Sequence, residues 1–196
     1  MRPMGRRRRF VLLFGVWGTL ATAGCSPRPQ TPGLAGSAGP IGTSELASTV
    51  ATAFDPELEL HVAPPQGWTL DPVKRTSQHI HKTWISPTGH TAYGVIRFRL
   101  PIPVSDDLAL WGFLREMRRT EGEAVLLEKT PGFPLADGLK VLSFTAEGGR
   151  YRVRTLLVTR GFRGWCVYAG TLREQPVQEH ELDTALRHRN ALRLPG

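Results

Sequence analysis

The sequence contains only two cysteines, Cys25 and Cys166, among its 196 residues. A scaffold held by several disulfides is therefore excluded, and a hydrophobic core must stabilise the chain. The sequence also lacks Gly-x-Ser-x-Gly, His-Glu-x-x-His and a glycine-rich phosphate loop. The usual signatures of serine hydrolases, zinc proteases and P-loop enzymes are thus missing. No motif in the sequence indicates a cofactor.

The N-terminus carries a short apolar segment behind a cluster of arginines. Four arginines at residues 6–9 precede the apolar residues 10–24. A membrane-spanning helix needs about 20 apolar residues, and this segment is shorter. A basic start followed by a short apolar run is typical of a secretory signal peptide. We therefore predict that residues 1–24 are an export signal, by either the general secretory or the twin-arginine route.

The residues that follow resemble the lipobox of bacterial lipoproteins. Ala23, Gly24 and Cys25 match that motif, although Thr22 stands where a larger aliphatic residue is usual. The resemblance implies cleavage before Cys25 and a lipid on its sulfur, which would hold the protein to a membrane of the cell envelope, on the periplasmic side or at the cell surface. An ordinary signal peptide or an uncleaved anchor, with Cys25 uninvolved, is the alternative. Residues 25–53 are rich in Pro, Gly, Ser, Thr and Ala and predict a flexible tether.

The positive charge of the chain is concentrated in the predicted signal. The whole sequence has 25 Lys and Arg against 17 Asp and Glu, a net charge of +8. Five of those arginines lie in residues 1–24, so the mature chain has 20 basic and 17 acidic side chains, a net charge of +3. This small excess gives little support to nucleic-acid binding. We expect a membrane, through Cys25, and an envelope protein or a small ligand as partners.

Residues 54–196 predict a single α+β domain. Alternating apolar residues and turn signals predict a mostly antiparallel sheet of about seven or eight strands, with two packed helices in the order ββββαββββα. Gly148-Gly149 predicts a tight hairpin turn. The expected strands cover residues 57–62, 68–70, 79–85, 91–100, 123–129, 138–147, 151–159 and 164–171, and the expected helices cover residues 105–121 and 175–192.

The order of these elements, together with Pro65-Gln66-Gly67-Trp68, resembles the PsbP-like fold. That fold occurs in small bacterial lipoproteins and in a photosystem extrinsic subunit. The resemblance implies a non-catalytic binding or assembly factor, and it assigns no functional residue in this chain.

Three histidines are the clearest candidates for a metal-binding or catalytic site. His79 and His81 are two residues apart on an expected strand and so face the same way. His90 follows a predicted turn and is a third potential zinc ligand. No acidic residue lies near them in the sequence, and partly exposed histidines on a polar strand face are the simpler interpretation. A zinc-dependent hydrolase is therefore the alternative to a binding module, and a structural surface lipoprotein without a ligand is a third hypothesis.

Two further features are candidate binding residues. Arg150, Arg152 and Arg154 alternate along one expected strand, where they could bind an acidic partner or an anionic lipid surface, or pair with neighbouring carboxylates. Trp111 lies in the first expected helix, in an apolar stripe with Leu108 and Leu114. We expect Trp68, Trp84, Trp111 and Trp165 to belong to the core or its edges, and a groove beside Trp111 and Phe113 could bind a small apolar ligand. Cys166, in an apolar strand, is expected to be a buried small hydrophobic residue.

Overall fold

A computed structural model describes residues 50–135 and 138–194 of the chain. The predicted signal segment, Cys25 and nearly all of the predicted tether lie outside the described residues. Within the described part, no helix is both long and apolar enough to cross a membrane.

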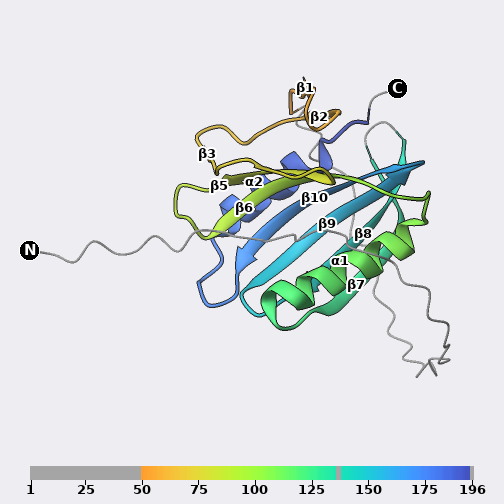
Figure 1. Cartoon of the computed structure of the whole chain (residues 1–196). Coiled ribbons are helices and arrows are strands. Elements are labelled where there is room, and N and C mark those ends of the chain that lie inside the picture. The colour runs from red at the N-terminus through yellow and green to blue at the C-terminus, as the bar shows by residue number, and fades with distance from the viewer. Residues whose placement is uncertain (1–49, 136–137, 195–196) are drawn as a thin grey trace, which may run out of the picture.

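The described part of the chain has an α+β fold, as predicted, with two helices and a mainly antiparallel sheet (Figure 1). The elements in chain order are β1 (Ala53–Asp55), β2 (Leu60–Val62), β3 (Thr69–Leu70), β4 (Lys74–Arg75), β5 (His79–Ile85), β6 (Thr91–Arg99), α1 (Asp106–Glu121), β7 (Val125–Pro134), β8 (Lys140–Glu147), β9 (Tyr151–Arg160), β10 (Arg163–Leu172) and α2 (Glu179–Asn190).

The main sheet has eight strands in the order β3-β5-β6-β10-β9-β8-β7, with β4 paired to β5. All pairs in it are antiparallel, and β6 and β10 form its centre. The predicted β8–β9 hairpin is present, but its turn is shifted by one residue to Gly149-Arg150, because Gly148 N donates to the Tyr151 carbonyl oxygen at 2.8 Å. A side chain at Gly149 would bring its Cβ within 2.6 Å of the Glu121 carbonyl oxygen, so the close approach of α1 requires glycine there.

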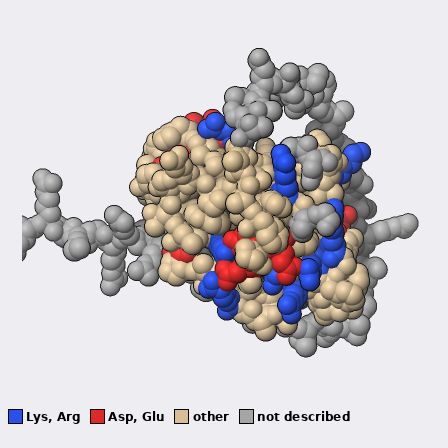
Figure 2. Space-filling model, turned by 90° about the horizontal axis from the view of Figure 1, so that it is seen from above, with Lys and Arg blue, Asp and Glu red and all other residues tan. Residues whose placement is uncertain are grey.

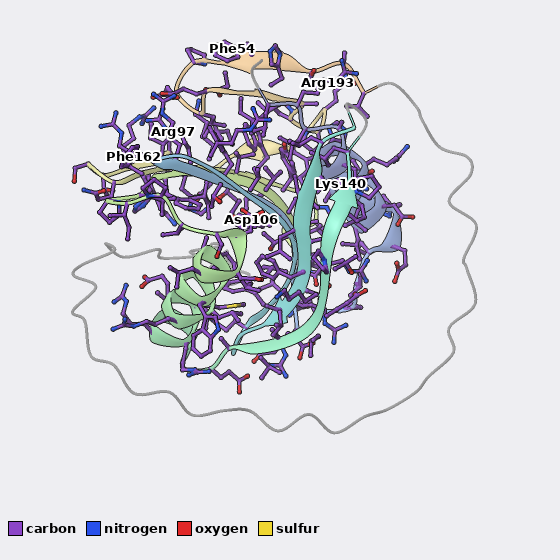
Figure 3. The ribbon with its side chains drawn as sticks, turned by 90° about the vertical axis from the view of Figure 1, so that its right-hand side faces the viewer. Phe54, Arg97, Asp106, Lys140, Phe162 and Arg193 are labelled. Carbon is purple, nitrogen blue, oxygen red and sulfur yellow. The ribbon has the colours of Figure 1, made fainter. Side chains whose placement is uncertain are left out.

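The two helices cover opposite faces of the sheet (Figures 1 and 3). On one side, which we name the α1 face, the sheet curls towards α1, and a buried cluster includes Phe113, Met117 and Phe144. On the other side, the α2 face, a second cluster joins Leu182 and Ala185 of α2 to Val167 and Leu156 of the central strands. Because strand side chains alternate, each central strand feeds both clusters.

Helix α1 has well-defined ends and a firm link to the sheet. Ser105 caps the first turn by accepting a hydrogen bond from Leu108 N at 3.3 Å, and Gly122 ends the helix with φ of 80°. Asp106, labelled at the start of the helix in Figure 3, accepts hydrogen bonds from Thr159 N at 2.8 Å and Thr159 Oγ1 at 2.7 Å. These bonds join α1 to β9.

A separate hairpin, β1–β2, packs against the α2 face through Leu58, Leu60 and Val62. The Trp165 indole N–H donates to the Leu58 carbonyl oxygen at 2.8 Å. The acidic residues of this segment pair with basic residues of the sheet, and Figure 2 shows the two signs of charge interleaved on that surface. The pairs are Asp55–Lys82, Glu57–Lys82, Glu57–Arg75, Glu59–Arg97 and Glu59–Arg163.

Several elements differ from the expectations. The expected strand 57–62 is a strand only from Leu60, because residues 56–59 form a turn in which Glu59 has φ of 51°. Strands β1 and β4 were not predicted, and β1 begins at Ala53, at the end of the expected tether. Residues 130–134, beyond the end of the expected strand 123–129, continue β7 through a register shift between Thr130 and Phe133. Helix α2 begins at Glu179, after Pro176, and not at residue 175.

Candidate functional site

His79 and His81 do share a face of β5, but that face is buried against the α1 side of the core. His81 is 2% exposed. Its Nε2 lies 2.8 Å from the Tyr168 hydroxyl and 2.9 Å from Thr83 Oγ1, and the two hydroxyl groups are 3.1 Å apart. The three polar atoms therefore form a triangle with every side within hydrogen-bonding distance, which we name the His81 triangle. Because Nε2 has one lone pair or one hydrogen, it bonds fully to one hydroxyl group at a time.

The sheet register explains how the His81 triangle forms. Gly94 on β6 lies between Thr83 on β5 and Tyr168 on β10. The Tyr168 ring crosses over Gly94, and a Cβ at that position would overlap the ring. Only glycine lets the tyrosine on β10 reach across β6 to the two polar residues of β5.

Burial makes the His81 triangle electrically neutral. It lowers the pKa of His81 to about 3, and the nearby positive charges of Lys74 and His79 act in the same direction. Burial also raises the pKa of Tyr168 well above its usual value. Because neither group is charged at neutral pH and both are bonded to each other, the arrangement satisfies buried polar atoms in the core.

His79 is bound within a turn. Its Nδ1 lies 3.0 Å from Thr76 Oγ1, which also accepts the His79 backbone N–H at 3.0 Å. The side chain is largely buried, and burial lowers its pKa, although the charge of Glu116 on α1 opposes that shift. The second imidazole of the predicted set thus has a structural partner of its own.

His90 lies at the opposite end of the β5–β6 hairpin from His79. Ile85 pairs with Ala92, so His90 lies beyond Ile85, while His79 pairs with Phe98. His79 and Ile85 are six positions apart along β5, which corresponds to about 20 Å. The expected approach of His90 to the other two imidazoles is therefore wrong. In the described ranges no group of three His, Cys, Asp or Glu residues has the arrangement of a metal site, and the buried His90 Nδ1 has no hydrogen-bond partner there.

The three candidate arginines have separate environments. Arg150 lies in the β8–β9 turn and pairs with Glu121 at the end of α1 at 2.8 Å. Arg152 pairs with Glu147 on the neighbouring strand. Arg154 lies half-buried on the α2 face, and no carboxylate pairs with it among the residues that the structure describes. Arg150 and Arg152 are therefore surface residues paired with carboxylates, which is one of the two alternatives that the sequence predicted.

Trp111 is 72% exposed, on the outer side of α1. The sequence placed Leu108 and Trp111 in the apolar stripe of the helix, but the buried residues of α1 are Ala109, Leu110, Phe113 and Met117. The core-facing side of the helix is thus rotated away from Leu108, which is 46% exposed. Arg115 and Arg118 lie on the same outer side and are exposed. This apolar and basic surface, comprising Leu108, Trp111, Arg115 and Arg118, is named the α1 outer surface.

Other expectations have mixed outcomes. Cys166 is free and 3% exposed, and burial raises its thiol pKa, as expected of a core residue. The other tryptophans of the domain are mainly buried, with Trp84 and Trp165 in the core. A shallow hollow on the described surface lies away from Trp111, beside Phe162, Arg163 and Trp165.

Sequence reasoning missed Arg189 of α2, which is a buried cation at 7% exposure. The helical spacing could have revealed its burial, because Arg189 lies four residues after Ala185 and seven after Leu182, on the buried side of α2.

No family model matches the chain, and no curated protein matches it. Among solved structures, it is similar to a crystal structure from Bacteroides thetaiotaomicron VPI-5482, determined at 1.50 Å resolution. The identity is 10% and the TM-score is 0.41. The match covers 76% of this chain and 49% of the other, so it spans about half the length of that protein. A likeness of this degree transfers neither fold nor function.

Proposed function

We propose that the protein is a lipid-anchored component of the cell envelope whose α+β domain is a non-catalytic binding or assembly module. The lipobox-like residues Ala23, Gly24 and Cys25 support the anchor. The α1 outer surface supports the binding role, and Trp111, at 72% exposure, is the observation that carries it. Leu108, at 46% exposure, lies one turn away on the same side of α1, so the two side chains form an exposed apolar patch of the kind that marks interaction sites.

The composition of the α1 outer surface favours a protein partner with acidic side chains around an apolar centre. Tryptophan and arginine are the residue types most enriched at the energetic centres of protein interfaces. Arg119 pairs with Glu116 on the same helix at 2.6 Å, whereas Arg115 and Arg118 have no carboxylate partner within the described ranges. Two unpaired guanidinium groups beside an exposed indole and a leucine are complementary to such a partner.

The His81 triangle favours this function over zinc-dependent hydrolysis. A catalytic zinc needs three ligands around an open coordination position. His81 is enclosed by the core, and its Nε2 is within hydrogen-bonding distance of two hydroxyl groups. Metal binding there would require opening the sheet beneath α1 and breaking the triangle.

Site-specific photocrosslinking in intact cells tests the docking surface. A benzophenone amino acid replaces Leu108 in the full chain, and a matched variant carries it at Arg187, which is exposed on α2 at the other face. We expect a discrete protein adduct from position 108 and none from position 187. The substitution Arg115→Glu, made with the probe at 108, should abolish the adduct by reversing the charge beside it.

Two outcomes would contradict the proposed partner. An adduct formed only with phospholipid would show that the α1 outer surface contacts the membrane. Equal adducts from positions 108 and 187 would show collision without specific docking.

A further inference from the structure

Helix α2 buries a positive charge near its C-terminal end. Leu182, Ala185 and Arg189 follow one another along its buried side, and Arg189 is 7% exposed. The guanidinium donates from Nε and Nη2 to the Asn190 side-chain oxygen, at 3.0 and 2.9 Å. That oxygen belongs to a neutral amide, so the bonds satisfy donors without balancing the charge.

A second arginine lies in the cross-strand row beneath this end of α2. The ring of His188, the residue before Arg189, packs edge-on against Tyr93 of β6 with 6.3 Å between ring centroids, and Tyr93 pairs with Ala169 of β10, which pairs with Arg154 of β9. Arg154 extends from the middle of β9 on the α2 face, between Thr145 of β8 and Ala169 of β10. Burial and, to a smaller extent, the positive charge of Arg154 together lower the pKa of Arg189 to about 10. Arg189 nevertheless remains protonated at neutral pH. The positive charges of the buried Arg189 and the half-buried Arg154 therefore face each other with little solvent to screen them.

This pair differs from the other arginines around the β8–β9 hairpin. The neighbouring arginines Arg150, Arg152 and Arg173 each pair with a glutamate. No carboxylate pairs with Arg154 or Arg189 among the residues that the structure describes. The C-terminal dipole of α2 favours one cation near the helix end, but it does not account for the second arginine. Burying an unbalanced charge is costly unless a counter-ion joins it.

We propose that Arg154 and Arg189 form a binding site for a small oxyanion, with phosphate as the best-fitting group, on the α2 face between α2 and β9. Planar guanidinium groups bind the oxygens of phosphates and carboxylates in pairs. Thr145 stands directly opposite Arg154 across the β8–β9 ladder, where cross-strand side chains lie about 5 Å apart, and its hydroxyl can add a third donor. This site is on the other face from the α1 outer surface, so its failure would leave the proposed docking untouched.

The test measures the thermal stability of the full chain, purified from membranes, in phosphate and in chloride at equal ionic strength. We expect a saturable rise in Tm that is specific to phosphate, because a ligand that binds the folded state stabilises it. Arg189→Gln and Arg154→Gln should each remove the rise. The control Arg152→Gln, on the same strand but paired with Glu147, should keep it.

Arg189→Met gives a second signature. The variant removes the like-charge pair, so without phosphate we expect its Tm to equal or exceed that of the parent, while the phosphate-dependent rise is lost.

Vesicles of phosphatidylglycerol and phosphatidylcholine then distinguish the source of the anion. Binding to phosphatidylglycerol that requires Arg189 indicates a lipid headgroup, and its absence together with the phosphate effect indicates a free anion.

The proposal is overturned if phosphate and chloride give the same Tm for the parent chain. It is equally overturned if Arg152→Gln removes the phosphate effect as completely as Arg189→Gln does, since that would indicate a diffuse response of surface charge.

Discussion

The Tyr168 hydroxyl lies 2.8 Å from His81 Nε2, although the two residues belong to strands that are not neighbours. Strand β6 separates them, and Gly94 is the residue of β6 over which the tyrosine ring passes. The contact joins β5 to the centre of the sheet by side chains, in addition to the backbone ladders.

The crossing predicts a strong coupling between Gly94 and Tyr168. Gly94→Ala places a methyl group inside the tyrosine ring, and we expect it to lower the free energy of unfolding by about 1–3 kcal/mol. In a Tyr168→Ala background the same substitution should cost much less, because the obstructing ring is gone. Urea unfolding of the four proteins of this double-mutant cycle measures the coupling. Equal costs in both backgrounds would contradict the crossing.

The depressed pKa of His81 predicts a pH-dependent stability. The pKa of His81 is about 3 in the folded state and about 6.5 in the unfolded chain. Between these two pH values the unfolded chain binds a proton at His81 and the folded protein does not, so protonation favours unfolding. The contribution of His81 is complete above pH 6.5 and is lost as the pH falls towards 3, at about 1.4 kcal/mol per pH unit.

His81→Gln should flatten this dependence between pH 6.5 and 4. Denaturant unfolding at several pH values measures it, and His180→Gln, at an exposed position of α2, is the matched control. A slope unchanged by His81→Gln would show that His81 is protonated in the folded protein.

The arrangement of the histidines also predicts a negligible response to zinc. His81 is enclosed by Tyr168 and Thr83, and His90 lies at the far end of the hairpin from His79. We therefore expect the Tm to be the same with and without saturating zinc. A zinc-dependent rise that His79→Gln and His81→Gln both abolish would restore the metal hypothesis.

Asp106 and Asp107 are adjacent at the start of α1, but their substitution should have unequal effects. Asp106 accepts two hydrogen bonds from Thr159 of β9, whereas Asp107 forms an exposed ion pair with Lys129. We expect Asp106→Ala to lower the free energy of unfolding by about 1.5–3 kcal/mol, and Asp107→Ala by about 0–1 kcal/mol. Denaturant unfolding distinguishes them, and equal losses would mean that Asp106 does not link α1 to the sheet.

The local signals of the sequence predicted the long elements well. Gly148-Gly149 identified the β8–β9 hairpin, and Ser105 with Gly122 bounded α1, because turn and cap chemistry depends on a few adjacent residues. Strands β1 and β4 were missed, because elements of two or three residues have no periodicity of their own and exist only by pairing with β2 and β5.

Relationships between distant residues were beyond sequence reasoning. The spacing of His79 and His81 correctly gave a shared face, but not whether that face was buried. The partner of His81 is 87 residues away, and its position depends on a strand order that brings β10 beside β6. For the same reason, the alternation of Arg152 and Arg154 did not reveal that Arg189 of α2 lies near the second of them.

The lipid anchor is tested most directly by the intact mass of the chain purified from membranes, beside that of a Cys25→Ala variant. We predict a mature N-terminus at Cys25 that carries the added mass of a diacylglyceryl group, with that mass absent from the variant. An unmodified chain that begins at another residue would contradict the anchor, and with it the proposal that this domain acts from a membrane of the cell envelope.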